Sequence, residues 1–287
     1  MKIIITGVNG YIAKTLKKNL PHSELISLRE NIDWKFLGKY DVCIHTAAIV
    51  HKKIKNKDEE KLCWEINTKL TINLAEQAKQ RGIKHFIFIS TMAVFGSDND
   101  VIGINTKPNP TTVYGKTKLV AEQEIMKLQC DTFKVTIIRP PMVYGPSCPG
   151  NYKKLKTISN IIPVFPNITN ERSVIFIGNL VLCIEQVILK GIIGILHPQD
   201  PQYIKTTELV EKIAKANKKK LYCSKLLGML IKLFLKKTSL YKKVFGSLVY
   251  TTNMSTYPNL LYQFYCLEEA ILLSEKRSLF KKDETNF

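Results

Sequence analysis

Tyr114 and Lys118 are the residues of this sequence whose types and spacing point most directly to chemistry. They stand four residues apart in a segment that predicts a helix from Tyr114 to about Leu128, so both side chains project from one helix face. A neighbouring ammonium lowers the pKa of a phenol and lets it exchange a proton near neutral pH. Thr91 follows a predicted strand over 85–89 and offers a hydroxyl to the same substrate oxygen. The set predicts an acid–base site, although the spacing alone also fits an ordinary surface pair.

The start of the chain predicts a phosphate site. The apolar, β-branched run at 3–5 is typical of a strand buried on both faces, and a helical pattern follows from Tyr11 to Leu20. Gly7 between them allows a tight turn, and Gly10 lets a pyrophosphate approach the backbone at the helix N-terminus. Ala13 is the small residue where the helix packs on the strand. These features favour dinucleotide binding over an ordinary strand–helix turn.

The elements that must position these residues alternate along the chain. Strands are predicted over 25–28, 40–48 and 85–89, and helices over 62–80 and 114–128. This rhythm predicts an α/β fold with a Rossmann-type, doubly wound parallel sheet that binds ligands at the carboxyl ends of its strands. The charged run at 51–61 is expected to be a solvated loop.

Composition narrows the class of protein. The chain has 287 residues, a hydrophobic content of 45% and a net charge of +19, the balance of a soluble globular protein with a basic surface. Its seven cysteines show no Cys-x-x-Cys spacing, which argues against a disulfide framework or a zinc site and fits a reducing compartment. Met1 leads directly into the first strand, so we expect no signal peptide, and no apolar run reaches the length of a spanning helix. The lysines accompany no recognition motif, so no nucleic acid partner is expected.

The order of these motifs resembles the extended short-chain dehydrogenase/reductases, specifically the NAD-dependent epimerase/dehydratase family that acts on nucleotide sugars. The resemblance is specific over roughly residues 1–190 and looser beyond. Further matching segments are HTAA at 45–48, Asn67, Thr71, STMAVFG at 90–96 and RPPMVYGP at 139–146.

The resemblance implies roles for the catalytic residues. Tyr114 would be the general acid/base, Lys118 would lower the pKa of Tyr114 and bind the nicotinamide ribose, and Thr91 would orient the sugar oxygen. This agrees with the chemistry of the residues, because hydride transfer at a sugar carbon requires a proton to move on the attached oxygen.

The resemblance also implies an NAD(P)(H) site. Its expected cofactor-binding residues are Gly7, Gly10, Tyr11, Ile12 and Ala13 around the pyrophosphate, Asp33 at the adenine, Ala47 along the cofactor, Arg29 at the adenosine ribose, and Lys118. An acid at the end of the second strand receives the ribose hydroxyls of NAD, whereas an arginine meets the 2′-phosphate of NADP. Arg29 and Glu30 stand side by side there, so the choice stays open, with NADP slightly favoured.

The implied substrate is a nucleotide-diphosphate sugar, UDP-linked in the closest motif match. Asn151 and Arg172 match residues that contact the sugar diphosphate and clamp the nucleotide phosphates, and Thr91 contacts the sugar. Thr91 is followed by Met92 rather than the Asp-Glu pair of dehydratases. Met142 stands where many UDP-hexose 4-epimerases have Asn. These departures favour reduction of a UDP-linked 4-keto-6-deoxy-N-acetylhexosamine for surface polysaccharide, with 4-epimerisation as the alternative.

The remaining expectations concern organisation. We expect a dinucleotide-binding domain over 1–146 plus about 173–200, and a smaller substrate-binding lobe over 147–172 and 201–287. A cytoplasmic location and a homodimer through 62–80 and 115–128 fit the resemblance.

The Lys-flanked apolar segment 218–243 offers an alternative, peripheral contact with the inner membrane face. An alternative of another class is a non-catalytic nucleotide-sugar-binding protein at a membrane surface.

Overall fold

The computed structural model describes residues 1–28, 33–50, 54–96 and 100–276. The chain divides into two compact units. Unit 1 comprises Met1–Pro141, Leu180–Pro198 and Tyr250–Tyr262; unit 2 comprises Met142–Asn179, Gln199–Val249 and the described residues from Gln263 onward. This division differs from the expected one in three places: residues 142–146 and 173–179 group with unit 2, and residues 250–262 group with unit 1.

A parallel sheet forms the centre of unit 1. Within the described residues it contains six strands, in the order β10 (Gly194–Leu196), β6 (Lys134–Ile138), β4 (His85–Ile89), β3 (Val42–His45), β1 (Ile3–Thr6) and β2 (Ser23–Ile26). The run at 3–5 is buried throughout, as its β-branched composition requires in a sheet covered on both faces. The order changes direction at β1, which lies between β2 and β3. The predicted Rossmann-type fold class is confirmed.

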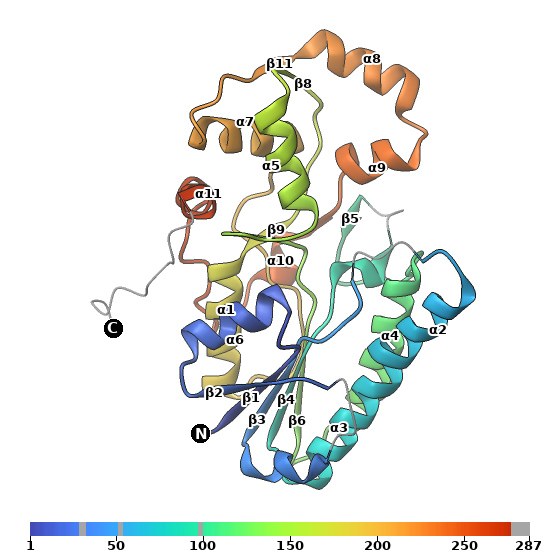
Figure 1. Ribbon diagram of the computed structural model, residues 1–287, viewed down its shortest axis with the longest axis vertical. Coiled ribbons are helices and arrows are strands. Elements are labelled where there is room, and N and C mark those ends of the chain that lie inside the picture. The colour runs from blue at the N-terminus through green and yellow to red at the C-terminus, as the bar shows by residue number, and fades with distance from the viewer. Residues whose placement is uncertain (29–32, 51–53, 97–99, 277–287) are drawn as a thin grey trace. The chain divides into compact units, whose positions relative to one another are not determined.

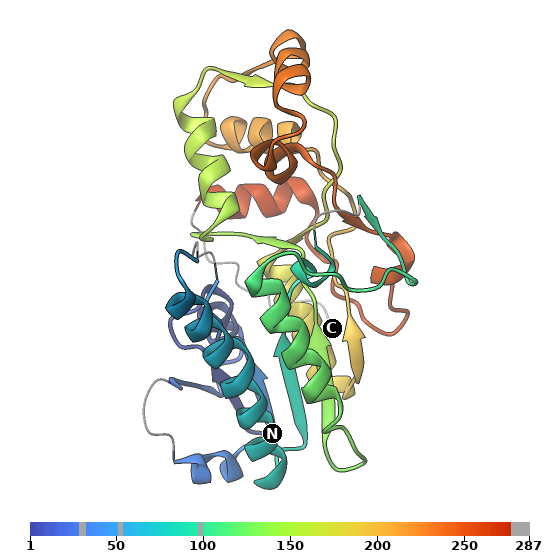
Figure 2. The same cartoon turned by 90° about the vertical axis from the view of Figure 1, so that its right-hand side faces the viewer.

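Helices cover both faces of this sheet (Figures 1 and 2). α3 and α4 lie on one face, and α1 and α6 lie on the other. The bounds in unit 1 are α1 (Tyr11–Asn19), η1 (Trp34–Lys39), α2 (Lys57–Trp64), η2 (Glu65–Leu70), α3 (Thr71–Gln80), η3 (Met92–Phe95), α4 (Val113–Met126) and α10 (Thr252–Ser255), with α6 (Ile177–Lys190) entering from unit 2 and β5 (Val101–Ile102) before α4. α2 begins at Lys57, inside the segment 51–61 that the sequence predicts as a loop. Asn56 fixes this start by accepting a hydrogen bond from Glu59 N.

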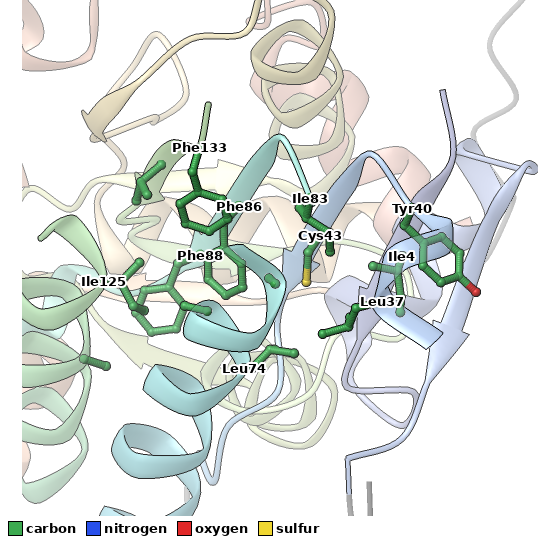
Figure 3. Packing of buried hydrophobic residues seen from close by; sticks show 14 of the residues in the cluster. Ile4, Leu37, Tyr40, Cys43, Leu74, Ile83, Phe86, Phe88, Ile125 and Phe133 are labelled. Carbon is green, nitrogen blue, oxygen red and sulfur yellow. The ribbon is translucent and has the colours of Figure 1, made fainter. Parts of the chain in front are cut away.

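The hydrophobic core under α3 and α4 holds the strands in place (Figure 3). Phe86 and Phe88 of β4 are fully buried and pack with Leu74 of α3 and Ile125 of α4. Each such side chain contributes about 1.5–3 kcal/mol by leaving water. The core therefore fixes α3 and α4 relative to the carboxyl end of β4.

Unit 2 is built from short parallel strand pairs and helices. β7 (Met142–Tyr144) pairs with β9 (Val174–Phe176), and β8 (Val164–Pro166) pairs with β11 (Tyr222–Ser224). The helices are α5 (Asn151–Ile161), α7 (Thr206–Ala216), α8 (Lys225–Leu235), α9 (Ser239–Phe245) and α11 (Leu267–Lys276), and β12 (Val249–Tyr250) lies at the unit boundary. Among the described helices, none combines the length and apolarity needed to cross a membrane.

Asp200 ties the elements of unit 2 together. Its carboxylate accepts from Tyr144 Oη at 2.9 Å, Asn179 Nδ2 at 2.8 Å and Phe176 N at 3.1 Å. Burial raises the pKa of Asp200 to about 6, although these donors lower it. One buried carboxylate therefore joins β7, β9 and the start of α6.

Candidate active site

The glycine turn lies at the point where the strand order of the sheet reverses. Gly7 follows β1 with φ +93°, a backbone conformation that favours glycine. A Cβ on Gly7 would lie 2.8 Å from Thr46 Oγ1 and 2.9 Å from Ala47 N, the residues that follow β3. The turn and the end of β3 are therefore in close contact, at the crevice where open α/β sheets bind ligands.

The N-cap residue of α1, Gly10, makes no side-chain capping hydrogen bond. Gly10 is the residue before the helix, and its extended backbone (φ −71°, ψ 146°) carries no side chain that could accept from the first turn. Ala13 is fully buried against the strand, as predicted. Backbone N–H groups at such a terminus attract a phosphate.

A buried hydroxyl marks the next strand along. Ser90 follows β4, and its Oγ is buried and has no hydrogen-bond partner among the described residues. Ser90, Ala47 and the Gly7 turn follow β4, β3 and β1, which are neighbours in the sheet. The buried Ser90 hydroxyl, small side chains and the N-terminus of α1 along one sheet edge fit an elongated dinucleotide.

The neutral side chain of His45 joins three elements at the same edge of the sheet. Its Nδ1 lies 2.6 Å from Thr6 Oγ1 and its Nε2 lies 2.9 Å from Thr71 Oγ1, while its ring stacks on Phe88. Burial, with the nearby charge of Lys118, lowers the pKa of His45 to about 3. The imidazole thus joins β1, β3 and α3 without adding charge.

Thr91 lies near Tyr114, close enough for its hydroxyl to lower the pKa of the Tyr114 phenol. Thr91 Oγ1 also accepts from Ala93 N at 3.1 Å, which starts the short helix η3 and fixes the hydroxyl. Gly115 permits the approach of α4, since a Cβ there would lie 2.6 Å from Ala93 O. Thr112 caps α4 by accepting from Gly115 N at 3.1 Å, which sets where the helix begins.

Lys118 lies one turn further along α4, at the end of β4. Its Nζ donates to Ile89 O at 2.7 Å and lies 3.8 Å from the centroid of the Phe88 ring. Burial lowers the pKa of Lys118 to about 7, although the carboxylate of Glu122 raises it. The ammonium is therefore poised to lose its proton near neutrality.

The structure corrects one expectation about Tyr114. Its pKa is raised above the ordinary value of 10.0 because burial outweighs the hydrogen bond from Thr91, which lowers it. The expected lowering by Lys118 does not set the direction, since the Lys118 ammonium itself is destabilised by burial and donates to Ile89 O. The phenol of this protein holds its proton firmly.

Glu122 was not found by sequence reasoning, although it stands four residues after Lys118 on the same helix. Its carboxylate accepts from Arg139 Nη2 at 2.6 Å and from Nε at 3.1 and 3.2 Å. The side chains are 2% (Glu122) and 7% (Arg139) exposed. The signal in the sequence was the i, i+4 spacing from Lys118.

A pocket of about 260 Å³ in unit 1 has Tyr114 in its wall. Its other lining residues come from the segment after β3, from α2 and from the start of α4: Ile49, Ile54, Glu59, Leu62, Cys63, Thr112 and Val113. Sequence reasoning did not name these residues, because they share no motif.

Asn67 holds the pocket wall in position. Its Oδ1 accepts from Ile49 N at 2.7 Å, and its Nδ2 donates to Ile49 O, Cys63 Sγ and Thr117 Oγ1 at 3.1–3.2 Å. Asn67 is fully buried within the π-helical turn η2. The turn thus connects the segment after β3 with α4.

The other predicted site residues belong to other elements of the fold. Asn151 begins α5 in unit 2, and Arg172 Nη1 donates to Gly246 O at 2.8 Å and Lys243 O at 3.4 Å at the end of α9. Asp33 is exposed and caps η1 by accepting from Lys35 N at 3.0 Å. Arg29 lies outside the described residues.

Tyr11 and Ile12 form the first turn of α1, beside Gly10 and within reach of the glycine turn that Gly7 makes. The structure therefore gathers Gly7, Gly10, Tyr11, Ile12, Ala13 and Ala47 around one strand edge, and Thr91, Tyr114 and Lys118 around the end of β4.

A nucleotide-binding sheet with a Thr–Tyr pair and a buried lysine at one strand end defines an enzyme of the short-chain dehydrogenase/reductase type. The chain belongs to the NAD dependent epimerase/dehydratase family, whose family model matches residues 3–188. The predicted family and the prediction of an enzyme are confirmed.

Three similar proteins illustrate the range of the family. A "UDP-glucose 4-epimerase" of Vibrio cholerae is 32% identical over 271 residues, which cover 79% of this chain and 81% of that protein. The crystal structure of UDP-glucuronic acid 4-epimerase from Bacillus cereus in complex with UDP-glucuronic acid and NAD has a TM-score of 0.75 at 22% identity, covering 96% and 98% of the two chains. That of dTDP-4-dehydrorhamnose reductase from Bacillus anthracis in complex with NADP has a TM-score of 0.63 at 21% identity, covering 77% and 82%.

Proposed function

We propose that this enzyme interconverts UDP-linked hexoses or N-acetylhexosamines that differ in configuration at C4, with Tyr114 as its acid–base residue. The observation that carries the proposal is Tyr114 on the wall of a pocket, with the Thr91 hydroxyl near enough to lower the pKa of its phenol. The similarity to a UDP-glucose 4-epimerase over most of both chains supports 4-epimerisation ahead of the reduction that the sequence motifs favour.

The proton chemistry follows from the positions of Thr91 and Tyr114. Loss of a hydride from a sugar carbon and of a proton from its oxygen turns a secondary alcohol into a ketone, and the reverse addition on the other face gives the epimer. Thr91, held by Ala93 N, orients the sugar hydroxyl. Tyr114 exchanges the proton with that oxygen. With its raised pKa, the Tyr114 phenol rests protonated, and its phenolate is a strong base for the hydroxyl proton of the sugar.

The Gly7 turn, the N-terminus of α1, Ala47, Ser90 and Lys118 are the residues that would hold the cofactor. A bound nicotinamide dinucleotide supplies the acceptor and donor of the hydride. Lys118, whose Nζ donates to Ile89 O at the end of β4, would bind the ribose hydroxyls of the cofactor. While protonated it would also stabilise negative charge that develops on Tyr114. The residues support NAD or NADP, since Arg29 and Glu30 favour opposite choices.

The second candidate is reduction of a UDP-linked 4-keto sugar, which uses the same residues. Met142, where many UDP-hexose 4-epimerases have Asn, is the observation that favours it. The two reactions differ in their consumption of cofactor, because an epimerase returns the hydride it removes.

Two measurements test and separate these candidates. The purified protein is denatured and its supernatant is scanned near 260 and 340 nm for released oxidised and reduced cofactor. UDP-glucose and UDP-N-acetylglucosamine are then followed by NMR without added cofactor. We expect epimer formation with no net change in absorbance, and a fall in kcat of about 10²–10⁴ in Tyr114→Phe. The exposed Tyr222→Phe is the matched control and should keep full activity. Stoichiometric consumption of NAD(P)H with a 4-keto sugar, and no epimerisation, would establish the reductase instead.

A further inference from the structure

α8 exposes a continuous apolar stripe to solvent. Its members share the spacing i, i+3, i+4, i+7 and i+8, and they are Leu226, Met229, Leu230, Leu233 and Phe234. Leu233 and Phe234 are 72% and 75% exposed. At about 100° per residue the stripe spans an arc of about 140°, as wide as the buried face of an ordinary surface helix. A stripe of this width on one exposed helix marks an interaction surface.

The opposite side of α8 is already used. Gly228 is buried against Asn167, and Leu227 and Ile231 are half-buried, so this side attaches α8 to β8 and its neighbourhood in unit 2 (Figure 1). The exposed stripe is therefore not the face that holds the helix in the fold.

Exposed apolar side chains also lie on neighbouring elements of unit 2. Tyr222 of β11 and Val164 of β8 are register partners, and both are exposed, as is Ile161 at the end of α5. We call these residues and the α8 stripe together the apolar patch.

Lysines predominate around the apolar patch. Along the helix Lys225, Lys232 and Lys236 fall on one flank of the stripe, at about 20–60° from its edge. Exposed lysines also precede and follow α8, at 218–220, 237, 242 and 243, and the sequence has no acidic residue between Glu211 and Glu268. Long lysine side chains keep their charge in the headgroup layer while their stems lie along apolar surface.

We propose that the apolar patch docks the enzyme on an anionic lipid surface, with α8 lying in the plane of the interface. Apolar side chains enter the acyl boundary while the surrounding ammonium groups meet lipid phosphates. A second copy of this chain is a poor occupant, because it would bring an equally lysine-rich face against this one. The proposal does not depend on the reaction that the active site catalyses.

Vesicle co-sedimentation of the full chain tests the proposal. Vesicles of phosphatidylcholine with about 30% phosphatidylglycerol should bind the protein, pure phosphatidylcholine should bind it at least tenfold less, and binding to the mixed vesicles should fall as salt rises from 50 to 500 mM. Replacing one flanking lysine, Lys232→Gln, should lower binding roughly fivefold.

The apolar contribution is tested with Leu233→Gln/Phe234→Gln. Both side chains are exposed, so the fold should be retained, and binding to the mixed vesicles should fall at least tenfold. Leu189→Gln on α6 is the matched control, since Leu189 is also a helical leucine and is 73% exposed. Activity on a soluble nucleotide sugar should be equal in all variants.

Three outcomes would overturn the proposal. They are no binding to the anionic vesicles, equal binding by the Leu233→Gln/Phe234→Gln protein, and an equal loss in Leu189→Gln. Concentration-dependent self-association that the double variant abolishes, without vesicle binding, would assign the patch to a second copy instead.

Discussion

The Glu122–Arg139 pair allows a sharp test of how the active site is supported. Replacing Glu122 with Gln leaves the guanidinium of Arg139 buried without a counter-charge, and its remaining contacts are weak compensation. These are the Phe95 ring at 5.1 Å and His197 Nε2 at 3.4 Å. Removing one partner of a buried ion pair costs about 3–5 kcal/mol. We expect Glu122→Gln to lower the free energy of unfolding of unit 1 by that amount.

The assay can follow unit 1 alone, because both tryptophans, Trp34 and Trp64, lie in it. Urea unfolding followed by tryptophan fluorescence gives the loss for Glu122→Gln, for Arg139→Met and for the double variant. The double variant removes both buried charges, so its loss should be smaller than the sum of the single losses by at least 2 kcal/mol or so.

A matched control lies two residues away on the same helix. Glu124 pairs with Lys127 at 2.7 Å, but both side chains are largely exposed, so Glu124→Gln should cost less than about 1 kcal/mol. Losses that are additive in the double variant, or a loss for Glu122→Gln no larger than for Glu124→Gln, would refute the reasoning.

Glu122 also acts on Lys118, whose pKa it raises. Lys118 is charged below its pKa, so activity that needs the ammonium is lost as pH rises through that pKa. In Glu122→Gln the pKa of Lys118 falls further, and the alkaline limb of kcat should move to lower pH. An unmoved limb would show that Lys118 is not the group that titrates there.

Three further predictions concern single side chains. Gly7→Ala should weaken NADH binding at least tenfold in a fluorescence titration, because the positive φ of Gly7 and its contact with Thr46 exclude a Cβ. Gly38→Ala is the control and should bind NADH normally, since a Cβ there would make an ordinary contact at 3.6 Å. Equal binding by the two variants would contradict this reasoning. Thr91→Val should lower kcat about 10–100-fold and Thr91→Ser should retain most of it, which a progress assay decides; equal losses would point to packing instead of the hydroxyl. Relative to Lys118→Met, the free energy of unfolding of the wild type should rise between about pH 7 and 10, by at most about 1.4 kcal/mol per pH unit. The reason is that the unfolded chain binds the lysine proton that the folded protein releases. A difference in urea midpoints that does not change with pH would contradict the lowered pKa of Lys118.

The sequence predicts the parts of the site that depend on local pattern. The run at 3–5, Gly7 and the helix that follows are where periodicity and turn chemistry place them, and β4 has its predicted bounds of 85–89. The helix that begins near Tyr114 puts Lys118 on the face that meets β4, as the spacing of four residues requires.

What the sequence could not predict depends on burial and long-range contact. The direction of the Tyr114 pKa shift follows from how deeply the phenol is enclosed, which no spacing encodes. The Glu122–Arg139 pair joins residues 17 positions apart, and the pocket wall combines segments from α2 and α4. Arg172 is engaged with the end of α9, a contact that a motif match does not reveal.

The π-helical turn at Glu65–Leu70 separates the part of one continuous helix that lines the pocket from the part that packs in the core. A π turn holds one residue more than an α turn, so it rotates everything before it by about 100° relative to everything after it. Deleting one residue there would turn Leu62 and Cys63 away from the pocket and leave Leu74 in its place in the core. Evolution could therefore reshape the substrate side of this helix by a one-residue change in length, without repacking the interior.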